Sequence, residues 1–130
     1  MAPRNADIPH ALGLLLVRRK QLEAALTFLQ EAATLAPDAP RYGYVYAVAL
    51  NSVGQGAKAI EVLRKLHERF PGDADILGAL ATYSRDAGDL PAALAYARKL
   101  VIVAPGDPGA KQLLSQLQAQ AGRLGPVRQR

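Results

Sequence analysis

Two histidines, His10 and His67, are the residues of this sequence best suited to acid–base chemistry near neutral pH. They occupy different positions in the helical pattern, and no serine, carboxylate or glycine loop completes a recognised catalytic arrangement around either one. The 130 residues contain no cysteine, which excludes a thiolate nucleophile and cysteine-ligated zinc or iron–sulfur sites. His, Asp and Glu do not share ligand spacing on one face. We therefore expect no enzyme activity, no metal and no cofactor.

The charge of the chain raises the question of nucleic-acid binding, because sixteen basic residues face eleven acidic ones. Arg4, Arg123, Arg128 and Arg130 lie in terminal segments without an acid, which leaves the rest of the chain almost balanced. The run Arg18-Arg19-Lys20 is more typical of a solvated helix C-terminus than of a phosphate site. We expect no nucleic acid among the partners.

A spacing of 34 residues organises the chain and defines the elements that must position its side chains. Pro37, Pro71 and Pro105 recur at this interval, and Gly54 and Gly88 share another position. Columns of apolar residues follow the same interval: Leu12, Tyr46 and Leu80; Gly13, Ala47 and Ala81; Ala25, Ala59 and Ala93; Leu29, Leu63 and Ala97.

Each repeat predicts a helix, a tight turn, a second helix and a proline-containing loop. A left-handed backbone at Gly54 and Gly88 is expected to end the first helix, whereas Lys20 at this place weakens the first turn. Asp89 and Asp107 precede prolines and are expected to cap the helices that follow. Seven helices are predicted, near residues 8–19, 22–35, 40–53, 57–70, 74–87, 90–103 and 108–121.

The columns resemble the tetratricopeptide repeat over residues 6–121, through Leu12-Gly13, Tyr46-Ala47 and Leu80-Ala81, each followed by the alanine and proline of its repeat. The sequence departs from the family where Pro9, Gly43 and Leu77 replace its early tryptophan. The resemblance implies an all-α fold: a right-handed superhelical stack of three antiparallel helix pairs plus a C-terminal capping helix. The expected organisation is an N-terminal extension at residues 1–5, repeats at 6–39, 40–73 and 74–107, the capping helix at 108–121 and a flexible tail at 122–130.

The resemblance also implies that the first helix of each pair lines a concave groove, which binds an extended peptide or a helix of a partner protein. Leu14, Tyr44 and Val48 then form an apolar floor, and arginines beside them suit carboxylates. For each arginine a solvated side chain is the competing interpretation, and for Tyr44 it is simple packing. The projected groove residues are His10, Leu14, Arg18, Arg41, Tyr44, Val48, Asn51, Ser52, Asp75, Gly78, Thr82 and Arg85.

Specific tail capture is disfavoured, because the family's carboxylate clamp of lysines and asparagines is absent where Ala11, Leu14, Val45 and Ala79 stand. Among the tyrosines, Tyr46 is expected in the core with Tyr42 on its general side, since alternate helix residues point in different directions. Tyr44 remains as the aromatic contact residue.

The two ends of the repeat array differ. The last helix carries one apolar stripe and a polar face, as a terminal cap requires. The first helix, by contrast, is apolar nearly all round, with Leu12 and the run from Leu14 to Val17. We expect either earlier repeats of a longer chain or a second copy to cover it, the latter giving a homodimer through the N-terminal helix. Burial within its own repeat is the competing interpretation.

These features predict a non-catalytic protein–protein interaction scaffold, with an assembly module as the alternative: homo-oligomerisation, or docking within a larger bacterial protein. Residues 10–18 and 42–50 also resemble repeats that follow a multihaem cytochrome segment in some bacterial proteins, which implies a C-terminal adaptor of an exported redox protein. The longest apolar run, residues 11–17, is too short to span a bilayer. We expect a soluble chain without membrane insertion, cytoplasmic by default and periplasmic if its parent is exported.

Overall fold

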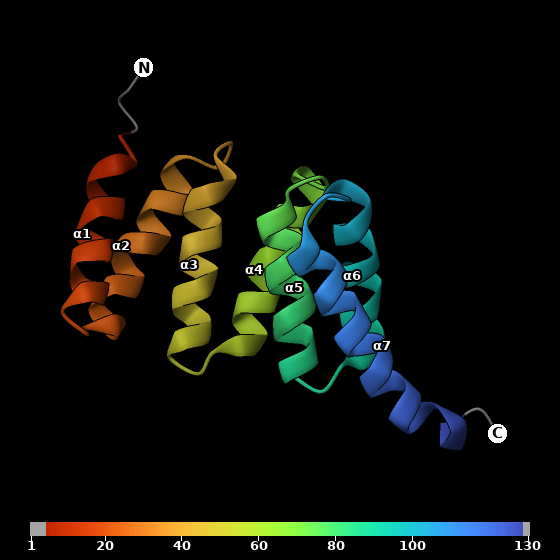
Figure 1. Cartoon of the computed structure of the whole chain (residues 1–130). Coiled ribbons are helices and arrows are strands. Elements are labelled where there is room, and N and C mark those ends of the chain that lie inside the picture. Colours follow the sequence, from red (N-terminus) through yellow and green to blue (C-terminus); the bar gives the residue numbers. More distant parts are fainter. Residues whose placement is uncertain (1–4, 129–130) are drawn as a thin grey trace. The chain divides into compact units, whose positions relative to one another are not determined.

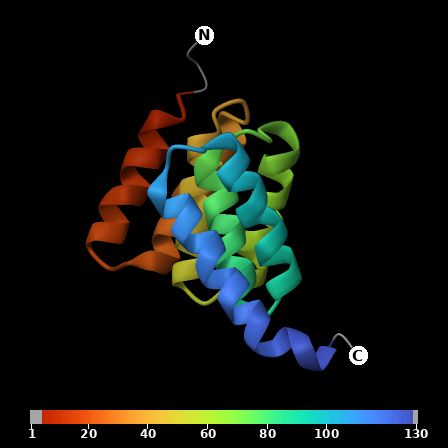
Figure 2. The ribbon, with the colours of Figure 1, turned by 45° about the vertical axis from the view of Figure 1, so that its right-hand side comes forward.

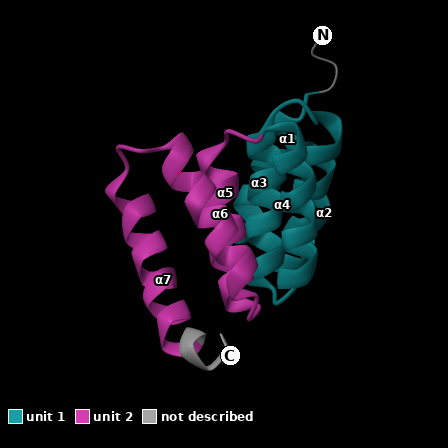
Figure 3. Ribbon diagram, turned by 90° about the vertical axis from the view of Figure 1, so that its right-hand side faces the viewer, with its two compact units in different colours: residues 1–70 teal, residues 71–130 magenta. Residues whose placement is uncertain are grey.

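The computed structural model describes the backbone of residues 5–128 and the side chains of residues 5–124. Every regular element in this part of the chain is a helix, which confirms the all-α prediction. The helices are α1 (Asp7–Arg18), α2 (Leu22–Leu35), α3 (Pro40–Ser52), α4 (Gly56–Arg69), α5 (Ala74–Asp86), α6 (Leu90–Val103) and α7 (Pro108–Arg128), labelled in Figure 1. The chain divides into two compact units, Met1–Phe70 with α1 to α4 and Pro71–Arg130 with α5 to α7 (Figure 3).

The helix bounds lie within one residue of those predicted, with a single correction at the end of α7. This helix continues to Arg128 rather than ending at residue 121, and its last turns extend beyond α6 (Figure 2). Gly122 takes no left-handed conformation, and the neighbouring Ala121, Arg123 and Leu124 are good helix formers. The flexibility of residues 122–130 stays a prediction. Residues 1–4 of the expected extension and residues 129–130 lie outside the described part.

The three tight turns between the helices of a pair have one geometry. Gly54 and Gly88 both have a φ of 86°, and Lys20 has a φ of 61° at the same repeat position. In each turn the residue after the left-handed one donates its backbone amide hydrogen bond to the carbonyl five residues earlier. These bonds run from Gln21 N to Leu16 O, from Gln55 N to Leu50 O and from Asp89 N to Ser84 O, all at 2.9 Å. Lys20 therefore ends its helix in the same way as the two glycines. The left-handed conformation costs more for lysine, because its Cβ comes close to the following carbonyl oxygen.

Carboxylates cap the helix starts of the second unit. The side chains of Asp73 and Asp89 accept hydrogen bonds from the amides of Ile76 and Ala92, at 3.0 and 3.1 Å. Asp107 accepts from the Gly109 amide at 2.9 Å, just before α7. The predicted caps at Asp89 and Asp107 are confirmed, and each satisfies an amide that has no partner within its helix.

In the first unit, consecutive helices pack in the order α1, α2, α3 and α4. Small residues let the helices of a pair approach closely, as the sequence predicts. A Cβ added to Gly13 would lie 2.5 Å from Cδ2 of Leu29, so the α1–α2 contact depends on the missing side chain. Ala25, Ala47 and Leu63 are fully buried around this framework.

In the second unit, α5 packs on α6, and α6 packs on α7. Ala81, Ala93, Ala97 and Leu117 form a buried cluster with members from all three helices. Leu117 of α7 is fully buried, while Lys111 and the glutamines at 112, 116 and 118 are exposed. This helix therefore has the single apolar face that was expected of a terminal cap.

Candidate partner-binding surface

The candidate surface of the first unit is carried by α1 and α3, the first helices of their pairs. His10, Leu14 and Arg18 are spaced four residues apart on α1, which places them on one helix face. The positions 34 residues later on α3 are Tyr44, Val48 and Ser52, with the same spacing. The two helices thus present equivalent stripes of the repeat, one on each.

The apolar part of these stripes is half-buried. Leu14, Tyr44 and Val48 each keep part of their side chain accessible while the rest packs within the unit. The packing within the unit already fixes the positions of such half-buried apolar side chains. Little conformational freedom is therefore lost when a partner binds to them. Partly accessible apolar side chains therefore occur on both helices, and their role as the floor of a groove stays a prediction.

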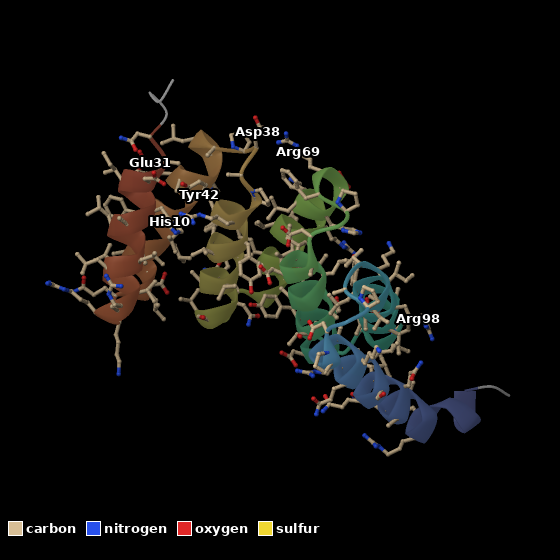
Figure 4. The ribbon with its side chains drawn as sticks, turned by 45° about the horizontal axis from the view of Figure 1, so that its top comes forward. His10, Glu31, Asp38, Tyr42, Arg69 and Arg98 are labelled. Carbon is tan, nitrogen blue, oxygen red and sulfur yellow. The ribbon has the colours of Figure 1, made fainter. Side chains whose placement is uncertain are left out.

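His10 differs from the other predicted groove residues because only 8% of its surface is exposed. Its ring packs edge-on against Tyr42, with centroids 4.9 Å apart and an interplanar angle of 79° (Figure 4). Burial, followed by the nearby Arg41 guanidinium, lowers the pKa of His10, while the Asp7 carboxylate opposes that shift. The Nδ1 atom is buried without a hydrogen-bond partner among the described residues.

Tyr42 is a residue that the sequence interpretation assigned to the general side of the core. In the structure its hydroxyl donates a hydrogen bond to Oδ1 of Asp7, and this bond raises the pKa of Tyr42. The Arg41 guanidinium lies over the same ring, 5.1 Å from its centroid. A polar cluster of Asp7, His10, Arg41 and Tyr42 therefore links the N-terminal ends of α1 and α3. The sequence signal was a separation of 35 residues between Asp7 and Tyr42, one repeat plus one position.

The remaining polar residues of α1 and α3 have different environments. Arg18 is exposed in the last turn of α1, where its charge faces the carbonyl end of the helix dipole. The Ser52 hydroxyl donates to the Val48 carbonyl at 3.0 Å, so its proton is used within α3. Asn51 is half-buried. Arg18 and Arg41 are thus the exposed cations of this surface.

The predicted groove residues of the second unit lie on α5 and are described within that unit alone. Thr82 is half-buried, and Asp75 and Gly78 are exposed and half-buried. Arg85 donates through Nε to Asp86 at 3.2 Å. That exposed pair is worth little energetically, but it partly neutralises the cation that was expected to receive a carboxylate.

A second feature of α1 is a stripe of exposed apolar side chains on its outer face, at Ile8, Leu12 and Leu15, exposed by 58, 41 and 38%. The residues 34 positions after Leu12 and Leu15 are Tyr46 and Ala49, each only 6% exposed because other helices cover α3. Leu12 and Leu15 thus occupy repeat positions that are buried one repeat later.

Two further observations bound the chemistry of the described residues. No group of three or more His, Asp or Glu side chains within them is arranged to hold a metal ion. Across the same residues, each helix is too short or too polar to cross a lipid bilayer.

Comparison with known proteins supports this interpretation of the fold. Residues 40–83 match the family model described as tetratricopeptide repeat. No curated protein sequence matches the chain.

Three solved structures illustrate the structural similarity. The Sgt2 TPR domain from Aspergillus fumigatus aligns with a TM-score of 0.83 at 20% identity, covering 94% of this chain and 82% of that one. The Arabidopsis OM64 TPR domain gives 0.77 at 18% identity over 88% and 95% of the two chains. PcrH from Pseudomonas aeruginosa gives 0.75 at 16% identity over 96% and 95%.

Domains with this fold are generally non-catalytic scaffolds for protein–protein interaction, built from stacked helix pairs. The resemblance inferred from the 34-residue columns is confirmed: the chain has the tetratricopeptide-repeat fold, and residues 40–83 carry the sequence signature of that family.

Proposed function

We propose that this protein is a non-catalytic scaffold that binds an extended peptide or a helical segment of a partner on the α1 and α3 stripes. One observation carries the proposal: Leu14 and Val48, one repeat apart in the same unit, are both half-buried apolar residues at the same position of a first helix. Stacked repeats place such positions on one continuous surface, which is the surface that repeat proteins use for recognition.

Charge supports a partner segment with an acidic residue beside its apolar contacts. Arg18 and Arg41 are exposed on the same two helices, and a guanidinium pairs with a carboxylate through two parallel hydrogen bonds. Tyr44 supplies the aromatic contact, a residue type enriched among the contacts that dominate binding energy. In the second unit, Thr82 and Arg85 are proposed as further contact residues.

The test is a selection from a random displayed-peptide library, followed by measurement of the dissociation constant of the selected peptide. Replacing Tyr44 and Val48 together by alanine is expected to weaken binding at least about tenfold, the loss expected when one dominant contact is removed. Arg41→Ala should reduce the preference for acidic peptides. The matched control replaces Lys58 and Arg64 by alanine, both exposed on α4. Unchanged affinity in the Tyr44 and Val48 double variant, with its fold verified by circular dichroism, would refute the assignment.

A second candidate function is assembly, and the exposed stripe of Ile8, Leu12 and Leu15 favours it. Apolar side chains at positions that a preceding helix covers in α3 fit a second copy of the chain packed against α1. Light scattering over a range of concentrations measures this directly. Docking within a larger bacterial protein and the likeness to cytochrome-linked repeats stay predictions.

A further inference from the structure

A surface pocket of about 260 Å³ lies between α2, α3 and α4, entirely within the first unit. Its apolar lining includes Ala33, Ala36, Gly43 and Val62, and its charged lining residues are Lys65 and Arg69. None of its lining residues belongs to the α1 and α3 stripes. The pocket is therefore a separate site from the proposed groove.

Small residues create this pocket. The residues 34 positions after Ala33, Ala36, Gly43 and Val62 are His67, Phe70, Leu77 and Tyr96, each much larger than its counterpart. Leu66 leans toward Gly43, since a Cβ there would lie 2.8 Å from Cδ1 of Leu66, yet the pocket remains open beside it. Because all four positions carry smaller residues than their counterparts one repeat later, apolar surface stays exposed in the pocket. Its contact with water costs free energy unless a ligand covers it.

Arg69 fixes one wall of the pocket. Its guanidinium donates to the Pro37 carbonyl at 3.1 Å and to Oδ1 of Asp38 at 2.6 Å, so the end of α4 holds the α2–α3 loop (Figure 4). The charge of Arg69 is thereby already paired. Lys65, one helical turn earlier, is exposed and forms no ion pair among the described residues. The unpaired charge beside the apolar lining is therefore positive.

We propose that this pocket binds a large apolar side chain of a partner peptide whose neighbouring residue is acidic. The volume is below the roughly 300–1,000 Å³ of small-molecule sites, and it suits the single anchor side chain that a protein partner inserts. The ammonium of Lys65 complements the carboxylate next to that anchor. Aromatic anchors such as tryptophan bury the most apolar area in such a pocket.

The absence of tryptophan from this chain provides a direct readout, because all tryptophan fluorescence then comes from the peptide and its emission shifts when the indole is buried. The probes are acetyl-Gly-Trp-Glu-Gly-amide and its counterpart with lysine in place of glutamate, titrated against the full chain. We expect a blue-shifted emission for both probes, with the acidic peptide binding roughly threefold more tightly, as for an exposed ion pair.

Variants locate the site. Ala36→Phe, which introduces the residue found one repeat later, should abolish the emission shift by filling the pocket. Lys65→Glu should reverse the preference between the two peptides, whereas Lys58→Glu, on the same helix but outside the lining, should leave it unchanged. Lys65 is exposed, so its replacement is not expected to disturb folding. Lys65→Glu therefore still tests the proposal if Ala36→Phe does not fold.

Three outcomes would overturn the proposal: no emission shift with either peptide, equal affinity of the wild-type chain for the two peptides, or undiminished binding of the acidic peptide by both Lys65→Glu and Ala36→Phe. Indole-3-propionate serves as a small-molecule comparison, and tighter binding of this acid than of the acidic peptide would reject a peptide as occupant. The groove variant at Tyr44 and Val48 is expected to bind these peptides normally, so failure of the pocket and failure of the groove are distinguishable.

Discussion

At the scale of single residues, the polar cluster at the N-terminal ends of α1 and α3 shows how burial changes the role of a candidate ligand. His10 was expected to line a groove, yet its ring packs against Tyr42 and most of its surface is covered. A neutral imidazole suits that environment, because Arg41 is near and desolvation penalises the charged form. His10 therefore links α1 to α3 and makes the stability of that contact depend on pH.

The pH dependence has a definite sign. The pKa of His10 is lowered in the folded chain, so the unfolded chain binds more protons below about pH 6.5, and stability falls as the pH decreases through that value. We expect His10→Phe, which keeps an aromatic ring against Tyr42, to lose less stability than the wild type between about pH 7 and pH 5. Urea unfolding of both proteins at the two pH values measures the difference. Parallel losses would show that His10 titrates as freely in the folded chain as in the unfolded one.

The repeat pattern predicts which residues of the candidate surface share a helix face, but it does not predict which side chains contact one another. The half-buried positions of Leu14 and Val48 follow from the repeat, since the spacing of four residues fixes a helix face. The hydrogen bond between Asp7 and Tyr42 joins two helices and depends on the rotamers of both side chains. No local pattern encodes such a contact, which explains why Tyr42 was assigned to packing alone.

At the scale of helices and turns, Gly13 decides how closely α1 approaches α2. Helix propensity alone predicts that Gly13→Ala stabilises α1 by roughly 0.5–1 kcal/mol. The added Cβ would, however, lie 2.5 Å from Cδ2 and 2.7 Å from Cγ of Leu29, and Cγ cannot move away without the whole side chain. We expect overpacking to win and the variant to lose about 1–3 kcal/mol in urea unfolding.

Gly72→Ala is the matched control, because no atom lies within 4 Å of a Cβ built at that position. This variant should be neutral or slightly stabilising, since alanine lowers the entropy of the unfolded chain. If Gly13→Ala were also stabilising, the α1–α2 contact would have to adapt to the extra methyl group. The close approach inferred here would then be wrong.

The helix bounds were predictable because the signals that set them are local. Prolines, the left-handed turn position and the capping aspartates act within one turn of the helix that they start or end. The end of α7 lacks such a signal, and Gly122 alone was a poor indicator of a helix stop. The pocket beside Gly43 could not be predicted, since its small lining residues come from three helices and become neighbours only on folding.

At the scale of the whole molecule, the exposed stripe on α1 predicts self-association. We expect the mean mass of the wild-type chain to rise toward that of a dimer as concentration increases, because Ile8, Leu12 and Leu15 form a contiguous apolar face. Leu12→Lys should keep the mass at the monomer value. Ile102→Lys is the control, since Ile102 is more exposed than the stripe residues but belongs to α6 of the second unit. A monomer at every concentration would leave partner binding as the supported function.

The glycines of this fold differ in how freely evolution can replace them, in an order opposite to that suggested by their backbone angles. The position with left-handed geometry already carries a lysine in one of three turns, so a substitution there costs only local strain. Gly13 and Gly43 have ordinary helical backbones but touch leucines of neighbouring helices, so a larger residue at either position requires that leucine or its helix to shift. In a lineage of such repeats, the turn position is therefore free to drift independently, whereas a change at Gly13 or Gly43 also demands an adjustment in how Leu29 or Leu66 packs.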